Sequence, residues 1–549
     1  MKGTIKHIRT ISLLSFTILL MLALSSCAPR NRERPEQNSL ESQSYLVAVE
    51  DEPDTVDFQC TSIHYTIAQN VFNRLVEMDT GKSGEVEIEP SLAKSWEISE
   101  DGKVYTFHLR DQVTFSNGSA LTSEDVKYTF TRLLTQPASC NRDIVDGILG
   151  AAALEKGETK ELKGFEILSD LDFTITLEHP FQAFLACLSM PGASILDKET
   201  MEKAGDRFGQ DVDSTIGTGS FILQKWTPGE GMLLKKNENC FDGAPRCDGL
   251  DLRFITDSKE IRRMFENGEI DVLDLDEVGN TAEFFIHGDI YQKRLFRVPR
   301  IGITYIALNE SIEPLNDVRV RRAMQLSLNR AVLLTAVYGG RGYVENGIYP
   351  HGLYGFDPDK PEIPFDPDEA KKLLSEAGFP DGFDLTISVN SASTRWELSV
   401  LRLAASMWEK IGIRSTIDVI SESQFMRLRK SGRLACYTAL WTADFNDPDN
   451  FIYTFFGDRE NTTFRSLCYP REDVMRRVRR ARTIMDPEER IQEYRELERI
   501  IVQEDCAWIP LYSRMRYYVT SERLRGITAS WNGSVKNMYR VMYLEEDSP

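Results

Sequence analysis

The chain has 549 residues, and 65 lysines and arginines against 85 aspartates and glutamates give it a formal net charge of −20. Hydrophobic residues make up 41% of the chain, a composition that supports large buried cores and excludes disorder throughout. At roughly 100–200 residues per domain, the length predicts several domains. The acidic balance, with a pI of about 5.0, argues against a nucleic acid as the main partner.

The N-terminus has the pattern of an export signal. Lys2, Lys6 and Arg9 form a basic start, and no acidic residue interrupts the apolar run over 11–24. This run is shorter than the ~20 residues that a membrane-spanning helix needs. We therefore predict a lipoprotein signal peptide over residues 1–26 and no membrane-spanning helix there.

Cys27 is the predicted site of lipidation. The residues Leu24-Ser25-Ser26 lead into it, which resembles the lipobox of bacterial lipoproteins, where the cysteine is acylated and becomes the mature N-terminus. Two or more acyl chains hold a protein stably on a bilayer, whereas one chain is marginal. Residues 27–44 then form a predicted polar tether. The alternative is an ordinary signal peptide followed by an incidental cysteine.

Eight further cysteines follow Cys27. In an oxidising envelope they could pair as disulfides, but buried free thiols fit the sequence equally well, and their pairing is left open. There is no C-x-x-C motif, so a zinc ribbon or a thioredoxin-type dithiol has no support. Two of the eight, at 240 and 247, are close enough in sequence to close a short loop. The eight are Cys60, Cys140, Cys187, Cys240, Cys247, Cys436, Cys468 and Cys506.

Strand and helix patterns alternate along the rest of the chain. Residues 104–109 alternate and are rich in β-branched and aromatic side chains, which predicts a strand. An acidic first turn before apolar residues at helical spacing predicts a helix beginning at Ser123. The Pro/Gly-rich segment 350–366 is predicted to be a loop, and a short helix follows within 366–378. Apolar periodicity predicts an amphipathic helix over 488–504. Together these patterns predict an α/β multidomain protein.

The sequence lacks the common catalytic and metal-binding motifs. Its six histidines are scattered without an H-x-x-x-H pair, and it has neither a phosphate-binding G-x-x-x-x-G-K-[ST] loop nor a G-x-S-x-G nucleophile motif. The segment 217–219 begins like a dinucleotide fingerprint, but Ile222 stands where the third glycine belongs. We therefore predict no enzyme activity, no catalytic residue, no metal and no cofactor. An envelope hydrolase is the less favoured alternative of another class.

The candidate constellation is the run 444–450, which follows Trp441. It holds Asp444, Asn446, Asp447, Asp449 and Asn450. Such a run could ligate Ca²⁺, but it lacks the glycine and the glutamate of an EF-hand loop. A solvated turn and a site for an organic cation remain the other two interpretations.

A dozen ordered motifs between residues 45 and 545 form the most specific pattern in the chain. In this order they resemble the extracytoplasmic peptide-binding proteins of ABC importers, the oligopeptide/dipeptide-binding solute-binding family 5. The sequence departs from the usual family pattern at 239–241 and 329–330. These departures bear on the subfamily to which the chain belongs, and not on the family. The motifs include Leu92-Ala93-Lys94-Ser95-Trp96, Asp101-Gly102, Tyr105-Thr106-Phe107-His108-Leu109-Arg110, Phe115-Ser116-Asn117-Gly118, Gly217-Thr218-Gly219-Ser220-Phe221, Asn267-Gly268-Glu269-Ile270-Asp271, Asp317-Val318-Arg319 and Gly378-Phe379-Pro380-Asp381-Gly382-Phe383.

The resemblance implies an α/β fold, a two-lobe periplasmic-binding-protein clamp with hinge strands and an extra subdomain inserted in the first lobe. Such clamps close on a ligand by hinge motion. The implied domains are a first lobe, an inserted subdomain and a second lobe. Their expected bounds are 45–80 with 215–305 and 515–549, then 81–214, and then 306–514.

The resemblance also implies where the ligand binds. In this family a carboxylate just after a tryptophan of the second lobe pairs with the peptide's free α-amino group, and Trp441-Thr442-Ala443-Asp444 matches that pattern. Asp444 is therefore the expected partner of the ammonium group. Trp441 is expected either to pack on the ligand backbone or to be a core residue. In this family the segment that holds Thr61, Ser62 and Tyr65 borders the amino-end subsite. These three could equally be ordinary loop residues with no contact to a ligand.

The other end of the ligand is less well defined. Short-peptide relatives often bind the C-terminal carboxylate through an arginine of the second lobe, and Arg395 lies in about the right region. Arg402 is its competitor, and both could equally be arginines on an exposed helix face. Asp447 is expected to support the site from behind or to face solvent.

The predicted function is a membrane-anchored receptor that captures short peptides outside the cytoplasm and delivers them to an ABC permease. An importer of many sequences binds what peptides share, their backbone and termini. The expected location is the cell envelope, on the periplasmic side of a bacterial membrane, and the expected state is a monomer. The alternative ligands are a cell-wall peptide, a metal chelate or haem, because one fold hosts several ligand classes.

Overall fold

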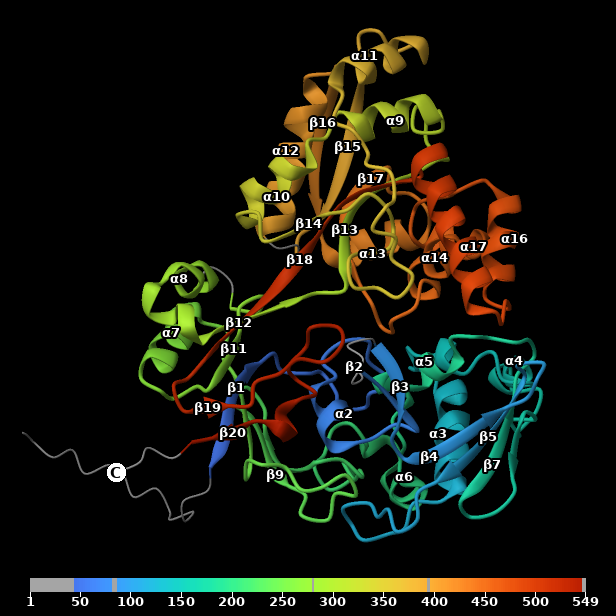
Figure 1. Cartoon of the computed structure of the whole chain (residues 1–549), viewed down its shortest axis with the longest axis vertical. Coiled ribbons are helices and arrows are strands. Elements are labelled where there is room, and N and C mark those ends of the chain that lie inside the picture. Colours follow the sequence, from blue (N-terminus) through green and yellow to red (C-terminus); the bar gives the residue numbers. More distant parts are fainter. Residues whose placement is uncertain (1–43, 81–85, 279–280, 393–394, 546–549) are drawn as a thin grey trace, which may run out of the picture. The chain divides into compact units, whose positions relative to one another are not determined.

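The computed structural model of the chain describes residues 44–80, 86–278, 281–392 and 395–545 (Figure 1). The predicted signal peptide, Cys27 and nearly all of the tether lie outside these residues. In the part of the chain described, no helix combines the length and the apolar character that crossing a bilayer requires.

A 12-stranded sheet runs through both lobes. The first-lobe half has the order β11-β1-β10-β9-β8, and the second-lobe half has the order β16-β15-β17-β13. The first-lobe strands are β1 (Tyr45–Glu50), β8 (Phe221–Thr227), β9 (Gly231–Lys236), β10 (Gly249–Phe254) and β11 (Val272–Asp274). The second-lobe strands are β13 (Gly302–Leu308), β15 (Phe383–Asn390), β16 (Ile413–Ile420) and β17 (Cys436–Thr442).

One long strand, β18 (Trp508–Thr520), joins the two halves (Figure 1). It pairs with β13 through its first residues and with β12 (Leu295–Pro299) and β11 through its last ones, while the short β14 (Gly342–Val344) pairs near its middle. Both ends of β18 are buried, but its central residues 514–517 are only half-buried. The chain crosses between the lobes here and on the β12–β13 segment, so the predicted clamp with hinge strands is confirmed.

Helices cover the lobes. Those of the first lobe are α2 (Thr66–Val71), α7 (Ser258–Glu266) and α8 (Ala282–His287), with a small β19–β20 pair (Leu524–Arg525 and Tyr543–Leu544). Those of the second lobe are α9 (Val318–Leu326), α10 (Arg330–Tyr338), α11 (Pro367–Glu376), α12 (Arg395–Glu409), α13 (Glu422–Lys430), α14 (Asp449–Phe456), α15 (Arg459–Phe464), α16 (Glu472–Ala481) and α17 (Pro487–Arg499).

The inserted subdomain has its own four-stranded sheet, in the order β4-β5-β7-β6, and its own core. The strands of this sheet are β4 (Ala93–Ile98), β5 (Val104–Leu109), β6 (Phe165–Ile167) and β7 (Asp172–Thr176). The strands β2 (Val76–Thr80) and β3 (Val86–Pro90) form a separate antiparallel pair. Its helices are α3 (Ser123–Thr135), α4 (Ala151–Glu155) and α5 (Phe184–Leu188), whereas the buried residues of the following α6 (Lys198–Ala204) belong to the first-lobe core. Because Leu75 and Met78 belong to this core, we propose that the subdomain begins near residue 75, ahead of the expected 81.

The local predictions agree with the structure for clear physical reasons. β5 has the predicted bounds, and α3 begins at Ser123 behind a capping box, in which the Asp125 carboxylate accepts the Thr122 N–H at 2.8 Å. α11 has Asp366 as its N-cap and a proline in its first turn. The helix predicted over 488–504 forms as α17 and continues as a π-helical turn over its last five residues.

Candidate ligand-binding site

Asp444 lies in the loop between the end of β17 and the start of α14. Its backbone N–H donates to Asn450 Oδ1 at 3.0 Å, and Asn450 Nδ2 donates back to Asp444 Oδ2 at 3.1 Å. This pair of hydrogen bonds closes the loop. Asp444 keeps an exposed surface, but the protein on the sides of its carboxylate withdraws much of the water around it.

The three aspartates of this loop differ in how their charges are balanced. Asp447 is buried and accepts two hydrogen bonds from the Arg490 guanidinium, at 2.7 and 2.8 Å. Asp449 is buried beside Arg482, with an N–O distance of 3.1 Å. Asp444 has only the neutral amide of Asn450, since no cationic group of the described chain lies within 4.0 Å of it. A carboxylate in this state is suited to bind a cation supplied from outside.

The expected interpretations of the run 444–450 can now be compared. Buried arginine partners already occupy two of its three carboxylates, so the run is not arranged as a Ca²⁺ site, and the described residues hold no cluster of metal-ligating side chains. Asp447 is expected from the sequence either to support the site from behind or to face solvent. Because it is buried, the second alternative is excluded. The interpretation that this geometry favours is a site for an organic cation at Asp444.

The surroundings make the Asp444 carboxylate unusually basic. Burial by the protein around it raises its pKa to about 6, and the charge of Asp143 adds to the rise. The hydrogen bond from Asn450 and the more distant Arg465 oppose the shift. Asp143 comes from a short 3₁₀ turn of the inserted subdomain, Arg142–Ile144, and burial raises its pKa as well. Because both carboxylates hold a proton more readily than usual, a cationic ligand would relieve their unfavourable ionisation.

Tyr65 lies close enough to Asp444 to respond to its charge. Burial raises the pKa of Tyr65, a hydrogen bond with Asn141 lowers it, and the charge of Asp444 raises it further. The Tyr65 hydroxyl is 2.8 Å from the Thr61 carbonyl and 3.1 Å from Asn141 Oδ1. Tyr65 and Thr61 of the first lobe thus share a hydrogen-bonded unit with Asn141 of the subdomain. Ser62 is an exposed residue of the same loop.

Trp441 is half-buried and belongs to the edge of the second-lobe core. Its ring meets Phe455 edge to face at 5.3 Å, and the Arg465 guanidinium lies 4.7 Å from its centroid. Its indole N–H is buried without a hydrogen-bond partner in the described chain. These contacts favour a packing role, and contact with a ligand stays a prediction.

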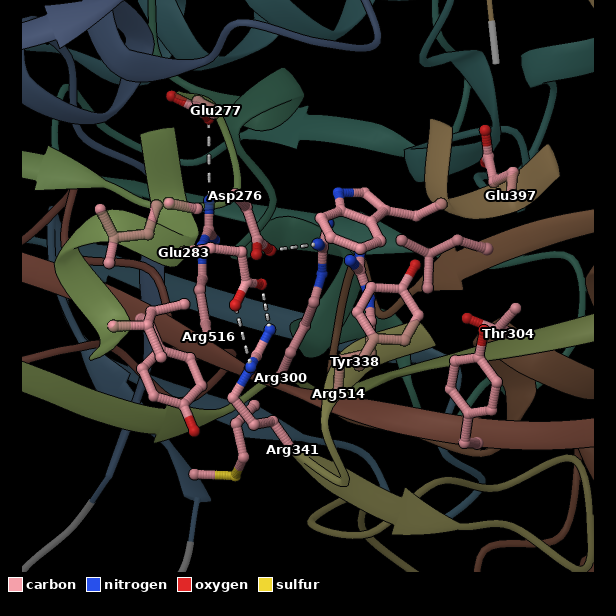
Figure 2. A pocket seen from close by; sticks show the side chains of 18 of the residues that line it. Asp276, Glu277, Glu283, Arg300, Thr304, Tyr338, Arg341, Glu397, Arg514 and Arg516 are labelled. Atoms are coloured by element: carbon pink, nitrogen blue, oxygen red, sulfur yellow. Dashed lines mark hydrogen bonds and ion pairs between the residues drawn. The ribbon is translucent and has the colours of Figure 1, made fainter. Parts of the chain in front are cut away.

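A second feature is a cavity of about 280 Å³ beside the crossing strand β18 (Figure 2). This volume is just below the ~300–1,000 Å³ range of small-molecule sites. α8, β13, α10, α12 and β18 contribute its walls. Four arginines line it: Arg300, Arg341, Arg514 and Arg516.

Three of these arginines have carboxylate partners and one does not. Arg300 pairs with Asp276 at 3.0 Å, and Arg341 pairs with Glu283 at 2.6 Å (Figure 2). Arg516 pairs with a buried aspartate of β11 at 2.5 Å. In the described chain Arg514 has no carboxylate within 4.0 Å, its Nε atom is buried without a hydrogen-bond partner, and its guanidinium lies 4.9 Å from the Tyr338 ring centroid.

The guanidinium groups of the cavity wall influence one another, although four acidic residues, Asp276, Glu277, Glu283 and Glu397, line the same cavity. Burial lowers the pKa of Arg300, and although Asp276 opposes this effect, the charges of Arg514 and Arg516 add to it. The guanidinium groups are thus close enough to repel one another. An anion bound at Arg514 would reduce this repulsion and supply the missing hydrogen-bond acceptor.

Arg300 connects the cavity with the Asp444 loop. While its guanidinium lines the cavity, its Nε donates to Thr442 Oγ1 at 3.3 Å, two residues before Asp444. The Ala443 N–H also donates to the Ile301 carbonyl at 2.9 Å. Hydrogen bonds from Arg300 and to Ile301 therefore link the wall of the arginine-lined cavity to the Asp444 loop.

The arginines expected from the sequence are placed differently. Arg395 is the first residue of α12, and its side chain lies outside the described residues, whereas its neighbours Trp396 and Glu397 line the cavity. Arg402 is exposed on α12 and is not part of the cavity wall. Sequence reasoning missed Arg514. The available signal was its position, with Arg516, in the middle of a long strand that is mostly apolar and aromatic.

Comparisons with known proteins support a binding protein. Residues 87–463 match the sequence model of "Bacterial extracellular solute-binding proteins, family 5 Middle". "Heme-binding protein A" of Haemophilus influenzae is 27% identical over 539 residues, covering 95% of this chain and 96% of its own. The "Dipeptide-binding protein" of Escherichia coli K12 is 28% identical over 459 residues, covering 81% and 84%. The structure of HbpA2 from Haemophilus parasuis matches with a TM-score of 0.76 and 26% identity, covering 91% of this chain and 99% of that one.

Proposed function

The chain belongs to family 5 of the bacterial extracellular solute-binding proteins, and we propose that it captures short peptides outside the cytoplasm and delivers them to the membrane subunits of an ABC permease. The members of this family are substrate receptors and not enzymes. In this proposal Asp444 binds the α-ammonium group of the peptide. The inserted subdomain borders the same subsite through Asn141 and Asp143.

The observation that carries this proposal is the state of Asp444. It is the one carboxylate of the 444–450 loop whose charge has no cationic partner in the described chain. A receptor for an ammonium group needs such a carboxylate, because an arginine already bound there would have to be displaced first. The hydrogen bonds with Asn450 hold the carboxylate in place without neutralising it.

The proposal also includes the carboxylate end of the ligand. Arg514 supplies a guanidinium with unused hydrogen-bonding capacity at a cavity that Arg300 links to the Asp444 loop. In this assignment Arg514 of the crossing strand, and not Arg395, binds the C-terminal carboxylate of the peptide. A short peptide in an extended conformation would place its two charged ends at these two sites and its backbone between them.

The first experiment identifies the natural ligand. The protein is purified from its own host under mild conditions, analysed by native mass spectrometry, and then denatured so that the released species can be identified. Peptides with free amino termini and a narrow range of lengths are expected. A haem, a metal chelate or another ligand without an amine would remove Asp444 from its proposed role. Loss of mass from an added peptide during incubation would instead indicate a hydrolase.

Peptide affinity is expected to depend on pH in a bell-shaped manner. The Asp444 carboxyl has a pKa of about 6 in the free protein, so below that pH it is protonated and no longer attracts the ammonium group. The affinity then falls by up to about tenfold per pH unit. Above about pH 8 the peptide loses its own charge, because an α-amino group has a pKa of ~7.7–8.0.

Calorimetry from pH 4.5 to 9 with a peptide of neutral side chains measures this dependence. In Asp444→Asn the acidic limb should disappear, because that limb reports the titration of Asp444. An affinity that stays constant from pH 7 to pH 5 in the wild type contradicts the assignment.

The lipid anchor at Cys27 is part of the proposal and has a separate test. With two or more acyl chains on this cysteine, the protein should fractionate with membranes. Cys27→Ala should move it to the soluble envelope fraction while leaving the peptide affinity of the purified protein unchanged. If the variant fractionates with membranes as the wild type does, the anchor at Cys27 is wrong.

A further inference from the structure

Two cysteines that are far apart in the sequence lie side by side near the Asp444 subsite. Cys60 is in the loop between β1 and α2, and Cys140 follows α3 in the inserted subdomain. The Cys140 N–H donates to the Gln59 carbonyl at 2.8 Å, and Cys140 Sγ lies 3.6 Å from the Cys60 carbonyl oxygen, across a sequence separation of 80 residues. The two residues therefore occupy adjacent, hydrogen-bonded segments.

Asn141 holds these segments together. Its Nδ2 atom donates to the Phe58 carbonyl at 2.9 Å and to the Thr61 carbonyl at 2.8 Å, on either side of Cys60. A disulfide needs two Cα atoms about 4.4–6.8 Å apart, with no backbone movement to bring them together. Both cysteines are free thiols in this structure, and the contact of Cys140 Sγ with the Cys60 carbonyl oxygen places the two residues directly beside each other.

The other six cysteines of the described chain are placed differently. Five are buried and one is half-buried, and the hydrogen bonds that their sulfur atoms make are to residues other than cysteine. Cys140 is exposed, so a soluble oxidant can reach it. Burial raises the pKa of the half-buried Cys60 thiol to about 12, and Asp57 contributes to the rise. Cys60 is therefore seldom ionised and would react only as the second thiol, once the sulfur of Cys140 beside it has become part of a mixed disulfide.

We propose that Cys60 and Cys140 form a disulfide in the exported protein. The Cys140 thiolate attacks the disulfide of an envelope oxidant, either oxidised glutathione or a thiol oxidoreductase, and releases one thiol of that oxidant. Cys60 loses its proton and attacks the Cys140 sulfur of this mixed disulfide, which releases the second thiol. One S–S bond forms in the protein, and two electrons and two protons pass to the oxidant.

The bond would fix the amino-end subsite. It joins the loop that carries Tyr65 to the segment that carries Asn141 and Asp143, the two parts of the chain that border Asp444. Reduction should let these parts separate and should weaken peptide binding. This consequence depends on the proposed function, whereas the disulfide itself does not.

Peptide mapping tests the bond directly. The full chain is purified from the envelope without reductant, denatured, alkylated before any reduction, and digested. A species linking the Cys60 and Cys140 peptides is expected, and it should separate into two alkylatable peptides after reduction. Alkyl label on both cysteines before reduction, or a link from either one to a third cysteine, overturns the proposal.

Thermal unfolding tests whether the Cys60–Cys140 disulfide stabilises the protein. Closing a loop of this length restricts the unfolded chain strongly, so reduction with dithiothreitol should lower the Tm of the wild type by roughly 5–10 °C. The double variant Cys60→Ser/Cys140→Ser should be insensitive to dithiothreitol, whereas the matched control Cys468→Ser should keep the full response. A wild-type Tm that is unchanged after verified reduction overturns the proposed stabilisation by this disulfide.

Discussion

Replacing Asp444 by asparagine should weaken the binding of a short peptide by roughly 10²- to 10³-fold. Leaving one member of a desolvated charge pair without its partner costs about 3–5 kcal/mol, and each 1.4 kcal/mol is a factor of about ten. Asparagine keeps the size of the side chain and can still accept the hydrogen bond from Asn450. The loss therefore reports the charge. Calorimetry at pH 7 with one peptide in free and N-acetylated forms measures it.

The acetylated peptide is the internal control of this experiment. The wild type should bind it far more weakly than the free peptide, and Asp444→Asn should bind both forms with similarly low affinity. Asp418→Asn, at an exposed carboxylate of the same lobe, should bind like the wild type. Equal wild-type affinity for the free and acetylated peptides contradicts the role of Asp444.

The stability of Asp444→Asn shows whether the variant is folded. Because the pKa of Asp444 is raised to about 6 in the folded chain, its ionisation opposes folding above that pH and has no effect once the carboxyl is protonated in both states, below its ordinary value of 3.8. The Tm of the variant should therefore exceed that of the wild type at pH 7, and the difference should disappear near pH 3.5. A lower Tm at pH 7 would attribute the loss of binding to misfolding.

Replacing Arg514 by glutamine should weaken the binding of peptides that have a free C-terminal carboxylate by about 10- to 100-fold. A hydrogen bond to a charged group contributes about 1.5–3 kcal/mol. Arg514 lacks a carboxylate partner in the described chain, so a ligand carboxylate would not have to displace one. Calorimetry compares one peptide with its C-terminally amidated form. The wild type should favour the free acid, and Arg514→Gln should bind the two forms nearly equally.

Arg402→Gln is the matched control for Arg514→Gln, since Arg402 is exposed on α12 and outside the cavity wall. It should keep the preference of the wild type for the free acid. If Arg402→Gln loses this preference and Arg514→Gln keeps it, the carboxylate binds at α12 and not at β18. If neither variant changes the preference, the carboxylate lies elsewhere and the cavity is not part of the peptide site.

The two substitutions together test whether one ligand spans both positions. For a dipeptide or tripeptide that contacts both sites, the double variant should bind about as weakly as the summed losses predict, because each contact is lost from the same bound ligand. A peptide whose amino end alone is bound should respond to Asp444→Asn and not to Arg514→Gln. The shortest peptide that responds to both gives the length for which the site is built.

The 444–450 loop shows how far the sequence leads and where it stops. Its composition identified a polar constellation, and the family pattern singled out Asp444 as the expected ammonium partner. The sequence could not show that Asp447 and Asp449 are neutralised, because their partners come from farther along the chain, Arg490 from α17 and Arg482 from the C-cap of α16. Only the packing of α16 and α17 against the loop separates two structural carboxylates from one that is open to a ligand.

Local patterns determined the secondary structure well. The strand β5, the capped start of α3 and the N-cap of α11 follow from side chains within a few residues of each other, and the ordered motifs were sufficient to predict the clamp fold. The position of Arg514 was not accessible in this way. Whether a carboxylate of the described chain comes within ion-pair distance of Arg514 depends on strands and helices that meet only in the folded chain.

The sequence by itself therefore determined the family and the clamp fold, and it singled out Asp444 as the candidate partner of an amine, because these depend on short-range patterns and on the order of motifs. The tertiary structure alone decided which charges remain unpaired, because pairing depends on distances between residues that are far apart in the chain. The same holds for Cys60 and Cys140, which are separated by 80 residues and brought together by the hydrogen bonds of Asn141.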